Sequence, residues 1–195
     1  MDIEKVKQNI VLASGSPRRI EMMQENGFRP QVMPSGIREN LPPFLTPREA
    51  TMFLAMSKAF DVRSRLAPDD ERLIVAADTV VVFEGRILGK PADPAQAKRM
   101  LLPMSGKKHE VITGVCLAFA GKSLSKCFAE TSSVYFKELP VDEIEAYVGT
   151  DEPYDKAGGY AIQGTFARYT DHIEGDRNNI IGFPWNAFMR ELRSL

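Results

Sequence analysis

The first residues with a spacing suited to chemistry follow a short apolar run at positions 10–13. Ser14-Gly15-Ser16-Pro17 comes next and leads directly into Arg18 and Arg19. This order predicts a strand, a turn and a helix start, with a serine as N-cap and proline at the first helical position. A helix start attracts anions and disfavours cations unless an anion binds beside them. The segment therefore predicts a phosphate site without the P-loop pattern, and a solvated helix start with arginines paired to carboxylates is the alternative.

Asp78 is the second candidate, because it interrupts the most apolar segment of the chain, residues 73–83. A carboxylate in such a place is costly unless it is hydrogen-bonded, ion-paired, bound to a metal or located at an open end of the sheet. One interpretation is a catalytic or metal-binding acid, and the other is a capped turn or a structural ion pair. Thr79 beside it can supply a hydroxyl or serve only as a β-branched strand residue.

Two lysines and one long loop complete the candidates. Lys58 lies in a helical pattern, and Lys90 lies in the turn Gly89-Lys90-Pro91, although single lysines are usually solvated. Residues 151–164, with the sequence DEPYDKAGGYAIQG, combine acidic residues, a lysine and paired glycines. Loops of this length are often functional, but a solvent-exposed connection would have the same composition.

Histidine and cysteine chemistry is disfavoured by spacing. His109 and His172 are not accompanied by a nucleophile motif such as GxSxG, so a catalytic triad is not expected. Cys116 and Cys127 have no CxxC spacing, which argues against a structural zinc site. A disulfide between them is not expected in a reducing compartment, where thiols are kept reduced.

Alternating and helical patterns predict the elements that position these residues. Strong punctuation includes the capping box Thr46-Pro47-Arg48-Glu49, the turn at Glu84-Gly85 and the helix start at Asp93-Pro94. Strands are expected at 10–13, 73–83, 86–88, 110–119, 128–136 and 166–173, and helices at 18–26, from 46, from 93, at 141–147 and at 184–195. This mixed order predicts an α/β or α+β fold with a mixed sheet, and residues 1–195 are interpreted as a single domain.

Composition excludes several classes of protein. The chain has 195 residues, 44% of them hydrophobic, and its 25 Lys+Arg against 26 Asp+Glu give a formal net charge of −1. A nucleic-acid-binding module would carry a basic excess, and a disordered chain would have few apolar residues. No window approaches the roughly 18 apolar residues of a membrane span, and the N-terminal residues are polar. We therefore expect neither nucleic acid nor a membrane as partner, and a cytoplasmic location.

Several separated motifs, in one order, resemble the Maf family of nucleoside triphosphate pyrophosphatases. The likeness covers residues 10 to about 188. It rests on the motifs at 12–19, 77–81, 89–91 and 155–164, on Ile173-Glu174-Gly175-Asp176, and on Asn179-Ile180-Ile181-Gly182-Phe183-Pro184. The resemblance implies an elongated, mixed, twisted sheet flanked by helices, with two lobes around a nucleotide cleft. It also implies hydrolysis of a nucleoside triphosphate to the monophosphate and pyrophosphate, with Mg2+ or Mn2+, and is compatible with a homodimer.

The resemblance also assigns roles to residues. Asp78 is similar to the catalytic proton acceptor, and Asp78 and Glu39 to the acidic residues that hold the metal. The substrate-binding positions are Ser14, Arg18, Arg19, Glu39, Lys58 and Lys90. The positions that influence the choice of base are Arg19, Thr79 and Gln163.

Residues 155–158 and 162–164 resemble the branch of the family that acts on dTTP and UTP, with CTP and modified pyrimidine nucleotides as further substrates. The Gln163 amide can both donate and accept hydrogen bonds, which suits uracil or thymine. Alternative interpretations are an inosine/xanthosine or 7-methyl-GTP pyrophosphatase, and a non-catalytic nucleotide-binding regulator of septum formation. Arg177 and the stretch at 166–169 depart from the usual family pattern.

Overall fold

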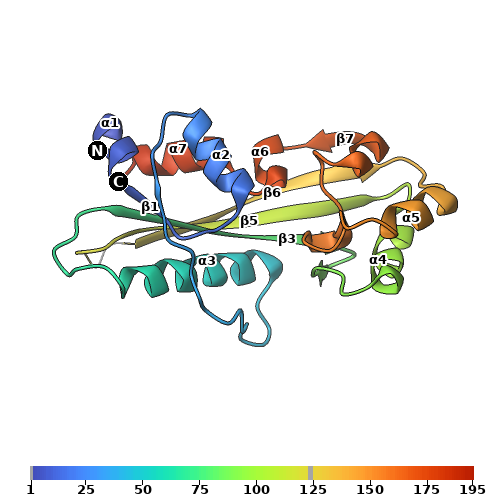
Figure 1. Cartoon of the computed structure of the whole chain (residues 1–195), viewed down its shortest axis with the longest axis horizontal. Helices are drawn as coiled ribbons and strands as arrows, with labels where there is room; N and C mark the ends of the chain where they lie inside the picture. The colour runs from blue at the N-terminus through green and yellow to red at the C-terminus, as the bar shows by residue number, and fades with distance from the viewer. Residues whose placement is uncertain (1, 123–124) are drawn as a thin grey trace. The chain divides into compact units, whose positions relative to one another are not determined.

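A mixed sheet organises the structure, a computed structural model that describes residues 2–122 and 125–195 (Figure 1). The strands follow the order β2-β1-β3-β5-β6-β7, and β4 pairs with β3. Their bounds are β1 Ile10–Leu12, β2 Gln31–Val32, β3 Leu73–Phe83, β4 Arg86–Leu88, β5 Lys108–Phe119, β6 Ser125–Phe136 and β7 Thr170–Glu174. The predicted mixed α/β architecture is confirmed.

Both pairing directions occur in this sheet. β1 is parallel to β2 and to β3, with Leu12 opposite Val75 in the second pair. β3 and β4 form the predicted antiparallel hairpin, in which Glu84 and Gly85 turn the chain with positive φ angles of 48° and 76°. Because β1 and β3 are parallel, the segments that follow them leave the sheet at the same edge. The first motif, after β1, therefore lies near Asp78 on β3.

The helices are α1 Ile3–Gln8, α2 Pro17–Glu25, α3 Pro47–Arg63, α4 Pro94–Leu101, α5 Val141–Val148, α6 Arg177–Ile181 and α7 Trp185–Arg193. Single 3-10 turns occur at Leu102–Met104, Ala157–Gly159 and Thr165–Tyr169. The capping box is confirmed at α3, where Thr46 Oγ1 accepts from the Glu49 N–H at 3.3 Å and Glu49 accepts from Thr46 N–H at 2.8 Å. None of the helices within the described residues is long and apolar enough to cross a membrane.

The chain divides into two compact units. Unit 1 comprises Met1–Asp78, Thr113–Glu130 and Gly182–Leu195, and unit 2 comprises Thr79–Ile112 and Thr131–Ile181. Strands β3, β5 and β6 each contribute residues to both units. The interpretation of the chain as a single domain remains a prediction.

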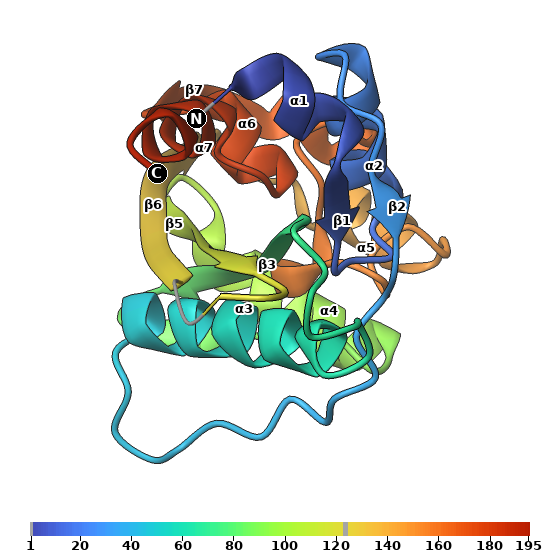
Figure 2. The ribbon, with the colours of Figure 1, turned by 90° about the vertical axis from the view of Figure 1, so that its left-hand side faces the viewer.

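Unit 1 is layered around its strands (Figure 2). α3 covers one face, where Ala55, Ala59 and Val62 pack with strand residues such as Ile74 and Cys116. α1, α2 and α7 lie on the opposite face (Figures 1 and 2), and there Phe28 and Phe188 pack edge to face at 5.7 Å. Burial on both faces explains why β3 is apolar without alternation.

Unit 2 has its own core, and this core corrects one prediction. Residues 166–173 were expected to form one strand, but Thr165–Tyr169 is a 3-10 turn and the strand begins only at Thr170. Phe166 is buried against the rings of Phe136, Tyr147 and Tyr169. Tertiary packing of this one aromatic side chain overrides the local β propensity.

Three short elements were not expected from the sequence: α1, β2 and α6. β2 has two exposed residues, and α6 has five residues in total. Elements of this length are too short to produce a readable period. Their existence depends on the neighbours that they pair with or pack against.

Candidate functional site

The turn after β1 is held by the side chains that the sequence singled out. Ser14 is buried, and its Oγ accepts hydrogen bonds from the Ser16 N–H at 3.3 Å and from Arg19 Nη1 at 3.0 Å. Ser16 itself makes no side-chain capping bond to α2, although Pro17 begins the helix as predicted. Ser14 therefore shapes the turn, and Ser16 is the N-cap residue of α2 as predicted, without the side-chain hydrogen bond that usually accompanies that position.

Arg19 has a structural contribution that sequence reasoning missed. Its Nη1 also donates to Ala77 O at 2.9 Å, and its Nε donates to Gly182 O at 2.9 Å. One guanidinium thus joins the turn after β1, strand β3 and the segment before α7. Its rigid fork of donors suits this task better than a lysine ammonium would.

The environment of Arg19 perturbs its acidity. Desolvation lowers the pKa of Arg19 to about 10, and the positive charge of Arg18 acts in the same direction, whereas Asp78 and Glu39 raise it. The side chain is still a cation at neutral pH. Two adjacent arginines and two acids therefore belong to one electrostatic environment in unit 1.

Lys58 lies between the two predicted acidic residues. Its Nζ is 2.6 Å from Asp78 Oδ1 and 2.7 Å from Glu39 Oε1. The Lys58 and Asp78 side chains are only 14% and 11% exposed, while that of Glu39 is 57% exposed. Residues that are 19 to 39 positions apart in the chain therefore meet at one ammonium group, which answers how Asp78 can be buried in an apolar strand.

Close packing of α3 against β5 places Lys58. A Cβ on Gly114 would lie 2.4 Å from the carbonyl carbon of Thr51, so only glycine allows this approach. Lys58 is seven residues after Thr51, which is two helical turns and therefore nearly the same face of α3. In the sequence, Gly114 is a single glycine within an apolar strand, and such a glycine is a signal of close backbone approach.

A second set of contacts holds the segment before Glu39. Asp61 on α3 accepts from the Gly36 N–H at 3.1 Å and from the Ser35 side chain, and Arg65 donates to Pro34 O at 2.9 Å. The Ser35 hydrogen bond holds the pKa of Asp61 below its usual value. Asp61 and Arg65 thus tie this segment to the helix that carries Lys58, and neither was predicted.

The remaining predicted residues belong to unit 2. Thr79 is partly buried on β3, whereas Lys90 and Gln163 are exposed. The turn that contains Lys90 is joined to the long loop, because the Gly158 N–H donates to Gly89 O at 3.0 Å. Gly158 has φ +71°, and a Cβ there would lie 3.0 Å from Val81, so the paired-glycine motif lets the loop lie against β3.

A buried hydrogen bond between His109 and Tyr160 anchors the same loop to β5. His109 on β5 hydrogen-bonds through Nε2 to the hydroxyl of Tyr160, and both side chains are buried. Burial lowers the pKa of His109 to about 4, so the ring is neutral near pH 7. The sequence indicated only that His109 is not part of a catalytic triad. Its partner, Tyr160, is 51 positions away in the chain and could not be identified from the sequence.

The acidic residues suit a divalent cation. The described residues contain no group of three or more His, Cys, Asp or Glu side chains that could hold a metal on its own. Mg2+ usually takes one or two protein carboxylates together with phosphate oxygens and water. Asp78 and Glu39 already converge on one cationic group, the ammonium of Lys58, so their donor set fits such an ion in company with a phosphate ligand.

Cys116 and Cys127 are both thiols, the first buried and the second partly buried. They lie close enough for a hydrogen bond, and this contact together with burial raises the pKa of Cys116. Both pack in the core of unit 1 beneath α3. They do not contribute to the group around Asp78.

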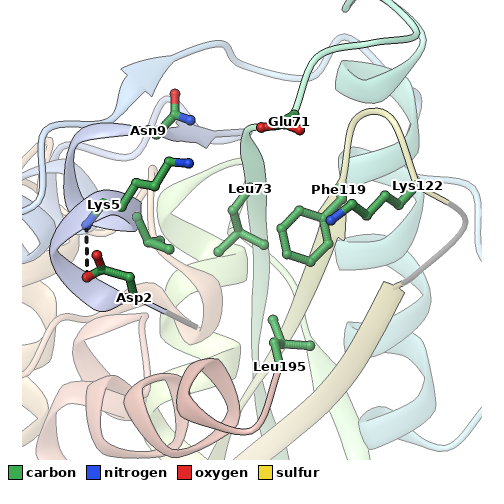
Figure 3. A pocket seen from close by; sticks show the side chains of 9 residues that line it. Asp2, Lys5, Asn9, Glu71, Leu73, Phe119, Lys122 and Leu195 are labelled. Atoms are coloured by element: carbon green, nitrogen blue, oxygen red, sulfur yellow. Dashed lines mark hydrogen bonds between the residues drawn. The ribbon is translucent and has the colours of Figure 1, made fainter.

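A separate hollow of about 320 Å3 lies in unit 1 where β3 begins, five residues before Asp78 (Figure 3). Leu73 and Phe119 form part of its apolar wall, and Lys5, Lys122 and Glu71 bring charges of both signs to its rim. This mixture selects no ligand class. The hollow includes none of the predicted site residues.

Comparison with known proteins agrees with the arrangement of these motifs. The family described as Maf-like protein matches residues 9–195. Proteins named dTTP/UTP pyrophosphatase from Bacillus cereus strain AH820 and from Bacillus cytotoxicus are each 41% identical over 186 residues, which is 95% of this chain and 95% of theirs. The Staphylococcus aureus Ham1 protein, a solved structure, aligns with 95% of this chain and 98% of its own at 16% identity and a TM-score of 0.45. The chain belongs to the Maf-like protein family.

Proposed function

We propose that the protein is a nucleoside triphosphate pyrophosphatase that hydrolyses dTTP and UTP to the monophosphate and pyrophosphate. The observation that carries the proposal is the meeting of Lys58, Asp78 and Glu39 at hydrogen-bond distance. It is supported by relatives named dTTP/UTP pyrophosphatase at 41% identity over 95% of the chain. CTP and modified pyrimidine nucleotides are further candidate substrates.

In this proposal the basic residues bind the triphosphate. Arg18 lies in the first turn of α2, where the helix start already favours an anion. Lys58 contributes charge beside Asp78, and Lys90 contributes it from its exposed turn in unit 2. Ser14 and Arg19 shape the turn that presents Arg18. Charge neutralisation of this kind is the expected main contribution to phosphoryl chemistry.

Asp78 accepts the proton of the attacking water. The water oxygen forms a bond to the α-phosphorus of the nucleotide. At the same time the bond between the α-phosphorus and the α–β bridging oxygen breaks, and pyrophosphate leaves. Lys58 contacts Asp78 Oδ1 and keeps the carboxylate oriented, so a proton can be taken by the second oxygen. Asp78 and Glu39 would also hold Mg2+ or Mn2+, which when bound supplies charge stabilisation at the phosphate oxygens.

Base choice is assigned to Gln163 and Thr79 of unit 2 and to Arg19 of unit 1. Gln163 offers an amide that donates and accepts, matching the O4 and N3–H edge of uracil or thymine. Thr79 directly follows Asp78 on β3 and is the second residue proposed to influence base choice. Arg19 is the third of these residues, and it hydrogen-bonds to Ser14 in the turn after β1.

The experiment is pyrophosphate release by the purified protein with Mg2+ or Mn2+ from dTTP, UTP, CTP, ITP, XTP and 7-methyl-GTP. We expect the highest kcat/KM for dTTP and UTP, with no turnover in EDTA. Preference for ITP or XTP, or for 7-methyl-GTP, would assign the protein to the corresponding alternative specificity. Saturable nucleotide binding without any product would instead support a non-catalytic regulator of septum formation.

Location and assembly belong to the same proposal. A cytoplasmic enzyme would act on the free nucleotide pool, and the family resemblance is compatible with a homodimer. Fractionation of cells and light scattering of the purified protein test these two points. Neither nucleic acid nor a membrane is proposed as a partner.

A further inference from the structure

The loop that carries Gln163 is closed by a single carboxylate, Glu152. Its Oε1 accepts from the Thr165 N–H at 2.9 Å, and its Oε2 accepts from the Thr165 hydroxyl at 2.6 Å. Both carboxylate oxygens are therefore engaged by one residue that is thirteen positions later in the chain. This two-point contact fixes the orientation of Thr165 as well as its distance from Glu152.

Gly164 lies against the same carboxylate. A Cβ on Gly164 would be 1.8 Å from Glu152 Oε1, so any larger residue would displace the Glu152 side chain. The Gly164 N–H also donates to Ala161 O at 3.1 Å, which makes a tight turn around Gln163. Gln163 is thus the exposed residue of a short turn whose C-terminal end is held by Glu152.

The N-terminal end of this turn is held independently. Tyr160 is buried and bonded to His109. Earlier in the loop, Lys156 Nζ donates to the backbone O of Glu152 at 2.6 Å, a contact that does not involve the Glu152 carboxylate. The chain from 160 to 165 therefore has a buried anchor at one end and the Glu152 contact at the other. Of these contacts, that of Glu152 with Thr165 is the one made at the surface, two residues from Gln163.

We propose that Glu152 is a positioning residue for base selection. Its contact with Thr165 holds the turn from which the Gln163 side chain extends, and so sets where the Gln163 amide can meet the base. This inference rests on the proposed function, because it assigns a role within the same nucleotide site. Glu152 is not proposed to touch the substrate.

The physical reason lies in the two ends of an amide. Uracil and thymine present a carbonyl and an N–H where cytosine presents an amino group and an acceptor nitrogen, and an amide that rotates by half a turn satisfies either. An amide presented from a held turn meets the base at one place and favours one set, whereas an amide on a mobile turn can shift to satisfy either. Loss of the Glu152 contact should therefore weaken discrimination more than it weakens turnover.

The test compares Glu152→Ala with three further variants. Glu152→Gln should keep part of the selectivity that Glu152→Ala loses, because its amide oxygen can still accept from the Thr165 N–H. Thr165→Val removes only the hydroxyl contact, whereas Thr165→Ser keeps both. Asp151→Ala removes a neighbouring exposed carboxylate and is the matched control.

We expect the ratio of kcat/KM for dTTP to that for CTP to fall about tenfold in Glu152→Ala, a size typical of one lost discriminating contact. The fall should be smaller in Thr165→Val and in Glu152→Gln, and absent in Thr165→Ser and Asp151→Ala. Hydrogen exchange of the peptide 160–166 should quicken in the same order. An unchanged ratio in an active Glu152→Ala enzyme would overturn the proposal.

The two proposals fail in different ways. A wild-type protein that releases no pyrophosphate from any triphosphate would overturn the proposed function, and base selection by Glu152 with it. A wild type that prefers dTTP and UTP, together with a Glu152→Ala variant of equal preference, would overturn only the role of Glu152. Faster loop exchange without a changed ratio would likewise overturn it, because the contact would then be merely structural.

Discussion

The predicted residues of unit 1 and those of unit 2 are held in opposite ways. In unit 1, Lys58 and Asp78 are mostly buried, lie on a helix and a strand, and contact each other directly. In unit 2, Lys90 and Gln163 are exposed in loops, and backbone hydrogen bonds and neighbouring residues hold those loops. Charged groups on regular elements are suited to chemistry, which needs exact distances, whereas exposed groups on a supported loop are suited to selection among ligands.

This difference predicts different consequences of mutation. A change at Asp78 or Arg19 of unit 1 should lower turnover or stability, because each of these side chains also bonds to another residue of the site. A change at Gln163 or His109 of unit 2 should alter selectivity or the pH dependence of stability and leave the chemistry largely intact. Four experiments with progressively smaller expected effects test this difference between the two units.

Asp78→Asn should have the largest effect. We expect kcat for dTTP to fall on the order of 10²–10⁴-fold, because the amide cannot accept the proton of water. Pyrophosphate release measures the rate, and circular dichroism checks the fold. Glu25→Gln, an exposed acid on α2, is the control and should retain full activity. Equal activity of Asp78→Asn and wild type would remove unit 1 as the site of chemistry.

Arg19→Met should lower the free energy of unfolding by about 3 kcal/mol, because it removes hydrogen bonds to Ser14, Ala77 and Gly182. Urea denaturation measures the loss. Arg18→Met, at the adjacent position, should mainly raise KM and change stability little. A similar loss of stability in both variants would show that the two arginines are not divided between structure and binding.

His109 should make unit 2 sensitive to acid. The pKa of about 4 in the folded protein is below the value of 6.5 for an unperturbed histidine. The neutral ring therefore contributes its full stability above pH 6.5, and this contribution is lost as the pH falls from 6.5 to 4. The total is about 3 kcal/mol for this shift.

The measurement is urea denaturation at pH 7 and pH 4.5 of wild type and His109→Gln, whose amide keeps a partner for Tyr160. The variant should lose about 2–3 kcal/mol less than wild type between the two pH values. His172→Gln, at an exposed histidine of unit 2, should follow wild type. Identical pH dependence in all three proteins would contradict the buried neutral state of His109.

Gln163→Ala should have the smallest effect on the protein as a whole. We expect the dTTP to CTP ratio of kcat/KM to change about tenfold, while stability stays within about 0.5 kcal/mol of wild type, as for other exposed positions. The nucleotide panel and urea denaturation measure both. An unchanged ratio would move base selection away from this loop and would remove the functional half of the contrast.

The strongest local signals predicted their elements well. The capping box at Thr46 and the turn at Glu84-Gly85 each specify backbone hydrogen bonds within a few residues, so neighbouring sequence is enough to identify them. The strand expected at 166–173 failed because Phe166 is held by rings from distant elements. Local propensity cannot report that packing.

The candidate site shows the same division. Asp78 was identifiable because a carboxylate in an apolar strand must have a partner, but the sequence did not identify Lys58 as that partner, or Glu39 as a second carboxylate on the same ammonium group. Glu152 and Tyr160 lie in a loop that the sequence singled out, yet their partners Thr165 and His109 emerge only from the folded chain.

The ends of most elements could be predicted from the sequence, because they depend on propensity and on hydrogen bonds between near neighbours. The order of the motifs can be read from the sequence directly. Tertiary structure alone decided which charges meet, since an ion pair depends on the close approach of α3 at Gly114 and on the parallel pairing of β1 with β3. Contacts between distant residues carry no local pattern. For that reason Arg19, predicted from its motif as a ligand for phosphate, is also the side chain that holds three segments of unit 1 together.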